Sequence, residues 1–231
     1  VHEKWDSNIA ILSGDVMLIR AYDLFLRSSS PELPVILKKF NSCAAEVCEG
    51  QQLDMNFETT STVTEGEYLE MIRKKTAVLL AFSLQLGAIL GSASPSDSDE
   101  LYQIGINSGI GFQLKDDLLD VYAEGDAFGK QVGGDIISNK KTFLLIKALQ
   151  LADGKTKEEL ERWLGMKEFA PNEKVDAVKS IYEDLDIKRL AENKMNEFFD
   201  SAFNIIERLS LTDEKKQPLI HFAYSLIDRK K

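Results

Sequence analysis

The sequence predicts an all-α protein. Apolar residues recur at helical spacing along almost the whole chain, and few segments show the strict alternation or the density of β-branched residues that strands need. With 231 residues, 44% of them hydrophobic, the chain is long enough to bury a substantial core. Because no internal repeat, low-complexity tract or linker interrupts the pattern, we expect residues 1–231 to form one domain.

The first predicted helices begin and end at recognisable residues. One runs from about residue 8 to 27 and ends in a polar run before Pro31. A second begins after a proline and covers about residues 34–57. Thr64 and Glu67 have the spacing of a capping box, in which each side chain bonds the backbone of the other, so a third helix is expected to start there.

The middle of the chain combines a very apolar segment with many small residues. The third helix contains the apolar run 77–90, which is shorter than the roughly 20 apolar residues of a membrane span and is therefore expected to be a buried central helix. Residues 92–98 are expected to form a loop, and 99–122 a helix. Small residues in that helix indicate close approach of another helix or a ligand: Gly105, Ser108, Gly109 and Gly111. Residues 124–139 are expected to be a glycine-rich loop.

The last third of the sequence is also expected to be helical. A helix covers about residues 141–151, and 156–231 contains further helices with charged outer faces, separated at Pro171, Asn172 and Thr212.

Charge and cysteine usage limit the classes of function. The 28 basic and 38 acidic residues give a net charge of −10, which excludes a broad basic surface for coating nucleic acid. An anionic ligand must therefore be met by local cations or metal ions. Cys43 and Cys48 lack metal-site spacing, which indicates a reduced, cytoplasmic protein, and both are expected in the core. No signal or transmembrane segment is recognised, and because the chain starts at Val1 we expect an N-terminal segment to be missing.

An acidic cluster is the most informative segment. Asp116 and Asp120 are four residues apart and Asp117 and Asp120 three apart, so on a helix three carboxylates gather along one edge. At ~4 Å one like-charged pair costs on the order of 4 kcal/mol near a protein surface, so the cluster needs a cation or full solvation. Its apolar flanks argue against solvation, and hard oxygen ligands without His or Cys favour Mg²⁺ bound together with phosphate. The alternative is a solvated acidic helix face.

Lysines follow the acidic cluster in flexible surroundings. Lys130 lies among glycines, and Lys140 and Lys141 follow the Gly133-Gly134-Asp135 turn. A Walker pattern is absent from the sequence, because no glycine at the required spacing is followed by GKS or GKT. Carboxylates combined with loop lysines indicate Mg²⁺-bridged binding of a diphosphate.

Several segments occur in a fixed order around this cluster. They are Val1-His2-Glu3-Lys4-Trp5, Leu12-Ser13-Gly14-Asp15, Gly50-Gln51 with Asp54, Tyr68 through Lys75-Thr76, Phe112-Gln113, Asp116-Asp117-Leu118-Leu119-Asp120, Gly129-Lys130, Gly133-Gly134-Asp135, and Lys140 with Thr142. In this order, over at least residues 1–149, they resemble the trans-type polyprenyl diphosphate synthases, of the short-chain farnesyl and geranylgeranyl kind. The acidic cluster resembles the second aspartate-rich motif of that family.

The resemblance implies an isoprenoid synthase fold, a helical bundle around a deep central cavity, and a homodimer. It also implies a reaction. An allylic diphosphate ionises, isopentenyl diphosphate attacks the cation through its double bond, and a proton is lost. The diphosphate leaves only if its charge is neutralised, while an apolar cavity excludes water from the cation.

The resemblance also assigns roles to residues. Asp116 is the implied direct Mg²⁺ ligand, with Asp117 and Asp120 nearer a water-mediated shell. Three lysines are expected to hold the allylic diphosphate: Lys75, Lys130 and Lys140.

Other residues are expected at the edges of this site. Thr76 and Gln113 are expected to place oxygen dipoles near the allylic cation; the alternative is that they are buried polar residues bonded to backbone. Gln51 and Asp54 either belong to the site or support it. His2 matches a position near the isopentenyl diphosphate pocket.

The family needs two facing aspartate-rich clusters, and this sequence contains one. We therefore expect the first cluster in the missing N-terminal segment, and little or no activity from residues 1–231 alone. A terpene cyclase and a non-catalytic partner subunit or helical scaffold remain as alternatives. The basic end 229–231 is expected to be a frayed terminus, or else to fold over the diphosphate site as in the family.

Overall fold

A computed structural model describes residues 1–123 and 133–229, and all regular structure in these two ranges is helical. The all-α prediction is confirmed. In chain order the elements are α1 (Ser7–Leu26), α2 (Leu33–Thr59), α3 (Glu65–Ile72), the π-helical segment η1 (Arg73–Ala77), α4 (Val78–Leu90), α5 (Pro95–Tyr122), α6 (Gly134–Ile137), α7 (Phe143–Leu151), α8 (Gly154–Gly165), α9 (Pro171–Asp184), α10 (Ile187–Arg208) and α11 (Asp213–Ile227).

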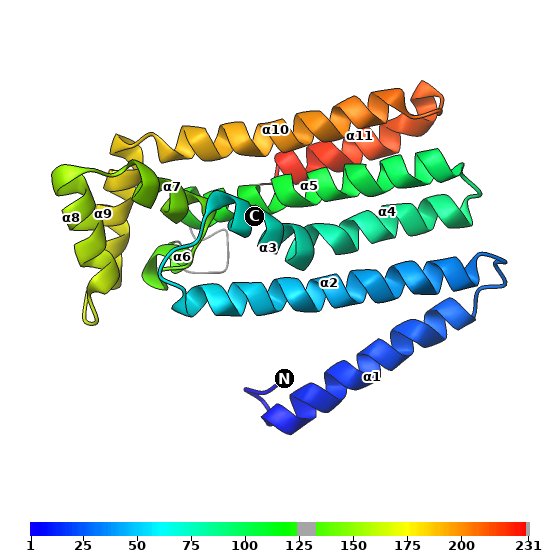
Figure 1. The fold of residues 1–231 in the computed structure, drawn as a ribbon, viewed down its shortest axis with the longest axis horizontal. Coiled ribbons are helices and arrows are strands. Elements are labelled where there is room, and N and C mark those ends of the chain that lie inside the picture. The colour runs from blue at the N-terminus through cyan, green and yellow to red at the C-terminus, as the bar shows by residue number, and fades with distance from the viewer. Residues whose placement is uncertain (124–132, 230–231) are drawn as a thin grey trace.

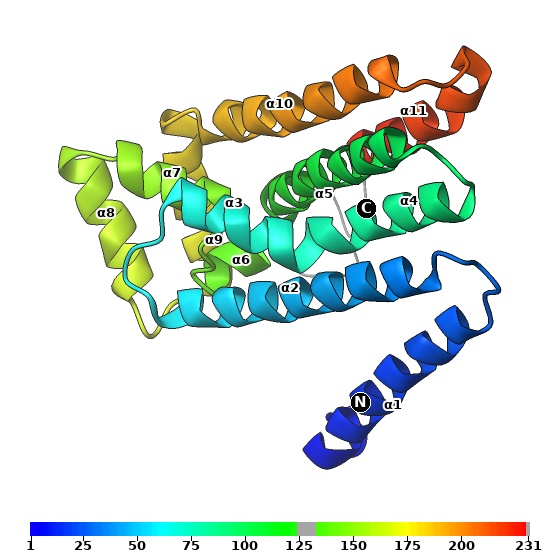
Figure 2. The same cartoon turned by 45° about the vertical axis from the view of Figure 1, so that its right-hand side comes forward.

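The long helices pack side by side in a row (Figure 1). Helix α2 packs against η1 and α4, α4 against α5, and α5 against α10, so that α5 lies inside the row. The shorter helices α6 to α9 gather at one end of the row, and α11 returns along α10 and α5. Helix α1 leans away from α2, as Figure 2 also shows, and none of its residues is buried.

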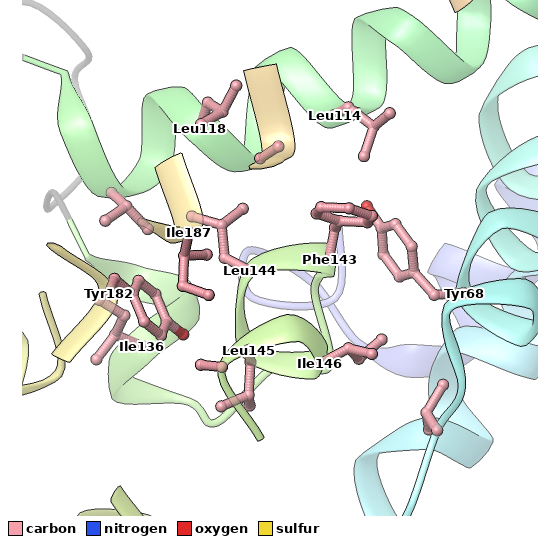
Figure 3. Close-up of a cluster of buried hydrophobic side chains, with 14 of the residues drawn as sticks. Tyr68, Leu114, Leu118, Ile136, Phe143, Leu144, Leu145, Ile146, Tyr182 and Ile187 are labelled. Carbon is pink, nitrogen blue, oxygen red and sulfur yellow. The ribbon is translucent and has the colours of Figure 1, made fainter. Parts of the chain in front are cut away.

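The largest group of buried side chains lies at the end of the row where α6 to α9 gather. Figure 3 shows Phe143 and Leu144 of α7 facing Leu114 and Leu118 of α5, with Tyr68 of α3 beside Phe143. Burial of such side chains is the main favourable contribution to folding. This core fixes the C-terminal half of α5, which carries the acidic cluster, against α3 and α7.

Two helix starts illustrate where sequence signals succeed and fail. The capping box is confirmed, because the Thr64 hydroxyl accepts a hydrogen bond from the Glu67 amide at 3.2 Å and the Glu67 carboxylate accepts one from the Thr64 amide at 2.8 Å. The loop expected at 92–98 is wrong: α5 already begins at Pro95. The Ser94 hydroxyl caps this start by accepting a hydrogen bond from the Asp97 amide at 3.1 Å. Proline is tolerated in the first turn because the N–H group that it lacks would have no carbonyl acceptor within the helix.

Three further boundaries differ from expectation. The glycine-rich stretch contains the short helix α6, while residues 124–132 lie outside the described residues. Pro171 and Asn172 begin α9 rather than only separating helices, and the connection between α9 and α10 turns at Asp186, which has a positive φ of 55°. Thr212 does precede a helix, α11.

The two cysteines differ in burial. Both are free thiols; Cys43 is buried, as expected, whereas Cys48 is exposed on α2, so its predicted core position is wrong. Burial, together with the neighbouring Glu46 carboxylate, raises the pKa of Cys43 to about 11. The cytoplasmic location inferred from the cysteines stays a prediction.

None of the helices in the described ranges is long and apolar enough to cross a membrane.

The small residues of α5 allow neighbouring helices to approach closely, as expected. A Cβ added at Gly105 would lie 2.3 Å from the Ala81 Cα, and one at Gly109 would lie 2.5 Å from the Ala77 Cα. At Gly111 an added Cβ would lie 2.8 Å from the Phe199 ring. The small residues therefore set how close α4 and α10 come to α5.

Gly105→Val is expected to lower the unfolding temperature, because the added side chain forces α4 and α5 apart. Overpacking of this kind costs about 1–3 kcal/mol. Gly87→Ala on α4 is the matched control. Its added Cβ meets nothing within 4 Å, and alanine favours the helix by about 1 kcal/mol over glycine. Thermal melts followed by circular dichroism should move in opposite directions, and equal losses would contradict the packing argument.

Candidate functional site

Lys75, the first lysine of the candidate site, lies in η1 where this segment packs against α2. A Cβ added at Gly50 of α2 would lie 2.3 Å from the Lys75 amide nitrogen, so glycine lets the two backbones touch. This contact brings the Lys75 Nζ to 2.6 Å from Oδ2 of Asp54, one turn along α2 from Gly50. The extra residue of a π-turn redirects side chains and is frequent at functional sites. Lys75 and Asp54 thus form a half-buried ion pair at the candidate site.

A chain of side-chain hydrogen bonds leads from Thr76 to the acidic cluster. The Thr76 hydroxyl donates to Gln113 Oε1 at 3.1 Å, and Gln113 Nε2 donates to Asp117 Oδ1 at 3.2 Å. The Tyr68 hydroxyl donates to the other oxygen of Asp117. Thr76 and Gln113 therefore bond to each other rather than to backbone, which corrects the buried-backbone alternative. Together they connect η1 to the C-terminal half of α5.

Asp117 is an anchoring carboxyl group in this arrangement. It is 2% exposed and therefore faces the protein interior. Burial raises its pKa to about 7, and the nearby Asp135 carboxylate adds to the shift, although the hydrogen bonds from Tyr68 and Gln113 oppose it. Burial and the negative charge of Asp117 likewise raise the pKa of Tyr68.

The three acidic residues do not share one environment, which differs from the predicted single edge. Consecutive residues on a helix point about 100° apart, so Asp117 turns into the core while Asp116 and Asp120 remain on the outer side. Asp116 Oδ1 lies 3.2 Å from the Arg229 guanidinium, which also covers the Phe112 ring at 4.9 Å. The expectation of a frayed end is therefore wrong for Arg229; Lys230 and Lys231 lie outside the described residues.

Asp120 supports the turn that carries the next lysine. Its Oδ2 accepts a hydrogen bond from the Asp135 amide at 2.9 Å, and its backbone carbonyl accepts from the Gly133 amide at 2.7 Å. Lys140 follows this turn, with its Nζ 3.4 Å from Asp135 Oδ1. Burial opposes the charged form of Lys140, but the Asp135, Asp117 and Asp54 carboxylates outweigh burial and raise its pKa.

Two further carboxyl groups of this region have raised pKa values. Burial is the first cause of a raised pKa at both Asp120 and Asp135. Repulsion from the Asp135 and Asp116 carboxylates raises the pKa of Asp120 further, and repulsion from Asp116 and Asp54 raises that of Asp135. Among the residues that the structure describes, no three His, Cys, Asp or Glu side chains form a group that could hold a metal ion. The donor chemistry nevertheless fits a hard cation at Asp116, because that carboxylate is partly exposed and offers hard oxygen donors.

Two cavities adjoin these residues. One, of about 440 Å³, is lined by Asp54, Phe57, Glu58, Ser138, Asn139, Lys140 and Lys141. The other, of about 360 Å³, is mainly apolar and is lined by Thr76, Leu79, Leu80, Ser83, Gly109, Phe112, Phe222 and Leu226. The hydrogen bond between Thr76 and Gln113 lies between the acidic cluster and the apolar cavity.

Some predicted residues are not brought to this region. Lys130 lies outside the described residues. Gln51 is exposed on α2 and forms no hydrogen bond or ion pair with the other described candidates. His2 pairs with Glu3 at 3.0 Å at the exposed start of the chain, where α1 stands apart from the row (Figure 1). Their assigned roles stay predictions.

Sequence reasoning missed Asp135 and did not identify the partner of Arg229. Asp135 was noted only as part of a glycine turn, yet its carboxylate pairs with Lys140. The basic end that contains Arg229 is expected either to fray or to fold over the diphosphate site, and Arg229 contacts Asp116 from 113 residues away in the chain. The positive charge of Arg229 was a sequence signal of an anion-binding role. Its acidic partner is shown only by the packing of α11 against α5.

Comparisons with known proteins agree with the order of the motifs. A family model described as polyprenyl synthetase matches residues 1–185. The chain is 42% identical to a short chain isoprenyl diphosphate synthase of Methanothermobacter thermautotrophicus over 71% of this chain and 51% of that protein. It is 33% identical to a geranylgeranyl diphosphate synthase of Sulfolobus acidocaldarius over 100% of this chain and 71% of that protein.

A solved structure has a similar fold. A crystal structure of a geranylgeranyl pyrophosphate synthase matches with a TM-score of 0.92 and 40% identity, over 100% of this chain and 72% of that one. The chain spans about half the length of the first curated relatives it matches, between 47% and 51%.

Proposed function

The chain belongs to the polyprenyl synthetase family, and from this membership we propose that the protein is a Mg²⁺-dependent prenyltransferase joining an allylic diphosphate to isopentenyl diphosphate. Its fold is the all-α isoprenoid synthase fold. The relatives described above are named as prenyl diphosphate synthases, which supports a synthase over a terpene cyclase or a non-catalytic scaffold.

One observation carries this proposal: charged groups suited to a diphosphate lie beside an apolar cavity. Lys75 and Lys140 are ammonium groups held by carboxylates, and Thr76 connects this polar region to the cavity of about 360 Å³. A prenyl diphosphate has the same two parts, an anionic head and a hydrocarbon tail. The arrangement thus matches the whole substrate class rather than the diphosphate alone.

Magnesium is part of the proposal. Asp116 and, one helical turn later, Asp120 are the residues expected to bring carboxylate oxygens to the cation. When bound, Mg²⁺ would supply positive charge to the departing diphosphate. The ion pair between Asp116 and Arg229 would have to open for a metal ion to take the Asp116 oxygen, because one carboxylate oxygen cannot keep close contact with both.

The residues of the chain then have separate tasks. Lys75 and Lys140 bind the allylic diphosphate and stabilise its charge as the carbon–oxygen bond breaks. The apolar walls beside Thr76 exclude water, which would otherwise capture the cation. The double bond of isopentenyl diphosphate forms the new carbon–carbon bond, and the proton lost afterwards is accepted by the released diphosphate.

A direct assay tests this function. The full-length protein is incubated with an allylic diphosphate and labelled isopentenyl diphosphate, with either Mg²⁺ or EDTA. We expect a longer labelled prenyl diphosphate only with Mg²⁺. No labelled product under any metal condition would overturn the proposal, and equal product in EDTA would overturn its Mg²⁺ part.

We further propose a homodimer formed through α1. This helix has no buried residue, although its sequence is rich in large apolar side chains. Those at least 40% exposed are Ile9, Ile11, Leu12, Val16, Met17, Leu18, Ile19, Leu24 and Leu26. An exposed apolar patch of this extent is typical of an interaction surface.

Leu12→Glu combined with Ile19→Glu is expected to convert the dimer into a monomer. The two residues are seven apart on one side of α1, and burying two added carboxylates at an apolar interface is unfavourable. Size-exclusion chromatography with light scattering measures the mass. Lys167→Glu, at an exposed site outside α1, should remain dimeric. A monomeric wild-type protein at high concentration would contradict the dimer.

A further inference from the structure

A buried lysine outside the family motifs lies in the first turn of α9. Lys174 has 0% exposure. Its Nζ donates hydrogen bonds to the Ile137 carbonyl oxygen at 3.2 Å and to Asn139 Oδ1 at 2.6 Å. The ammonium also lies 4.2 Å from the centre of the Phe169 ring. Both hydrogen-bond acceptors belong to the turn that leads into Lys140.

This burial is costly, so packing alone does not account for it. Desolvation lowers the pKa of Lys174, and both of its hydrogen-bond acceptors are neutral groups. A buried ammonium with only neutral partners is less favourable than an apolar side chain of similar size. Hydrogen bonds, unlike apolar contacts, fix the direction of the groups that they join. The role that fits Lys174 is therefore to hold its two acceptors in place.

Helix α9 holds both ends of the short helix α6. At the start of α6, Gly133 has a φ of +83°, and a Cβ there would lie 2.7 Å from the Val175 side chain. At the end of α6, the Ile137 carbonyl receives its hydrogen bond from Lys174, the neighbour of Val175. On the opposite side, the Asp120 carboxylate accepts from the Asp135 amide. The turn is thus fixed between α5 and the first turn of α9.

Asn139 passes this restraint to the next residue. Its φ of +55° is unusual for a residue other than glycine, and both ends of its side chain are bonded. Oδ1 accepts from Lys174, and Nδ2 donates to the Leu164 carbonyl oxygen at 3.0 Å. Lys140 follows directly, with its amide bonded to the Asp135 carbonyl oxygen at 2.9 Å. The direction in which the Lys140 side chain leaves the backbone depends on this left-handed residue.

We propose that Lys174 is a positioning residue that holds residues 137–140 so that the Lys140 ammonium faces the acidic cluster and a bound diphosphate. The inference rests on the proposed function for its diphosphate part. The geometric part, that Lys174 controls the exposure of Lys140, can be tested without any turnover.

The first test measures the chemical reactivity of Lys140 in the full-length protein. Lys174→Met removes the ammonium and keeps an unbranched side chain, whereas Lys174→Arg keeps a cationic donor. Trace acetylation followed by mass spectrometry should show several-fold faster modification of Lys140 in the Met variant and recovery toward the wild-type rate in the Arg variant. Lys167→Met, at an exposed lysine upstream of α9, should leave the acetylation rate of Lys140 unchanged. Unchanged reactivity in a folded Met variant overturns the inference.

The second test separates binding from folding. Lys174→Met is expected to lower kcat/KM about 10- to 100-fold, with a higher KM for the allylic diphosphate and an unchanged KM for isopentenyl diphosphate. A merely structural role would reduce the active fraction and leave both KM values unchanged, which overturns the proposal. If wild-type protein forms no product, the proposed function fails, but the acetylation result still decides whether Lys174 positions Lys140.

A second variant guards against misfolding. Asn139→Gly keeps a residue that adopts positive φ and removes only the side chain that Lys174 holds. We expect the same direction of change as in Lys174→Met, in both Lys140 acetylation and the KM for the allylic diphosphate. In a double-mutant cycle with Lys140→Ala, the effects of Lys174→Met and Lys140→Ala on that KM should not add, because Lys174 acts through Lys140. Additive effects overturn the proposal.

Discussion

Replacement of Asp116 by alanine is expected to reduce prenyl transfer at least about 100-fold while the helical fold persists. Removing one group that stabilises transition-state charge typically costs about 10²–10³ in turnover. The expected loss of stability is small, because the partly exposed ion pair with Arg229 contributes about 0–1 kcal/mol. The predicted variant therefore separates catalysis from folding.

Two measurements and two controls make this prediction specific. Turnover is measured over a range of Mg²⁺ concentrations, and the unfolding temperature is measured in the same buffer. Glu100→Ala changes an acid on the same helix that lies outside the cluster, and it should retain activity. Arg229→Ala removes the partner of Asp116 without removing the carboxylate, and it should reach half-maximal activity at a lower Mg²⁺ concentration. Normal activity of Asp116→Ala would remove this residue from the site.

Helix identity could be predicted from the sequence because apolar spacing and caps act locally. Thr64 and Glu67 bond each other across one turn, so their spacing alone specifies the start of α3. Pro95 shows where such local signals become ambiguous, because a proline can either end one helix or occupy the first turn of the next. The cap formed by Ser94 distinguishes these two positions. The π-turn at Arg73–Ala77 has no local sequence signal, and it lies where Gly50 of α2 closely approaches the η1 backbone.

Site residues that lie on one helix could be predicted from the sequence. Hydrogen-bond partners that are distant in sequence could not, because tertiary packing determines them. The positions of Asp116, Asp117 and Asp120 follow from the helical repeat. Which of the three faces the core depends on tertiary packing, and the hydrogen-bond donor to Asp117, Tyr68, is 49 residues away. Lys174 lies four residues before the buried Val178, and a lysine on a buried stripe was a usable signal of a buried ammonium. Its acceptors on the α6 turn required the structure.

The buried state of Asp117 leads to a second large effect, in which stability and activity change in opposite directions. Burial raises the pKa of Asp117 from 3.8 to about 7. Between these values the unfolded chain loses the proton and the folded protein keeps it, so folding becomes less favourable as the pH rises through this range. Above about pH 7 the folded protein must carry a buried charge, and the contribution of protonated Asp117 to stability is lost.

Asp117→Asn is therefore expected to raise the unfolding temperature at pH 8 and to leave it near the wild-type value at pH 4. For a chain of this size, each kcal/mol corresponds to about 2–4 °C. Turnover should fall, because Tyr68 and Gln113 donate to different oxygens of Asp117, and an asparagine replaces one of these acceptors with an NH₂ donor. Melting curves in EDTA over pH 4–8 measure the effect, with Asp176→Asn on an exposed face of α9 as the control. An asparagine variant that is less stable than wild type at pH 8 would contradict the assignment of Asp117 as a carboxyl group destabilised by burial.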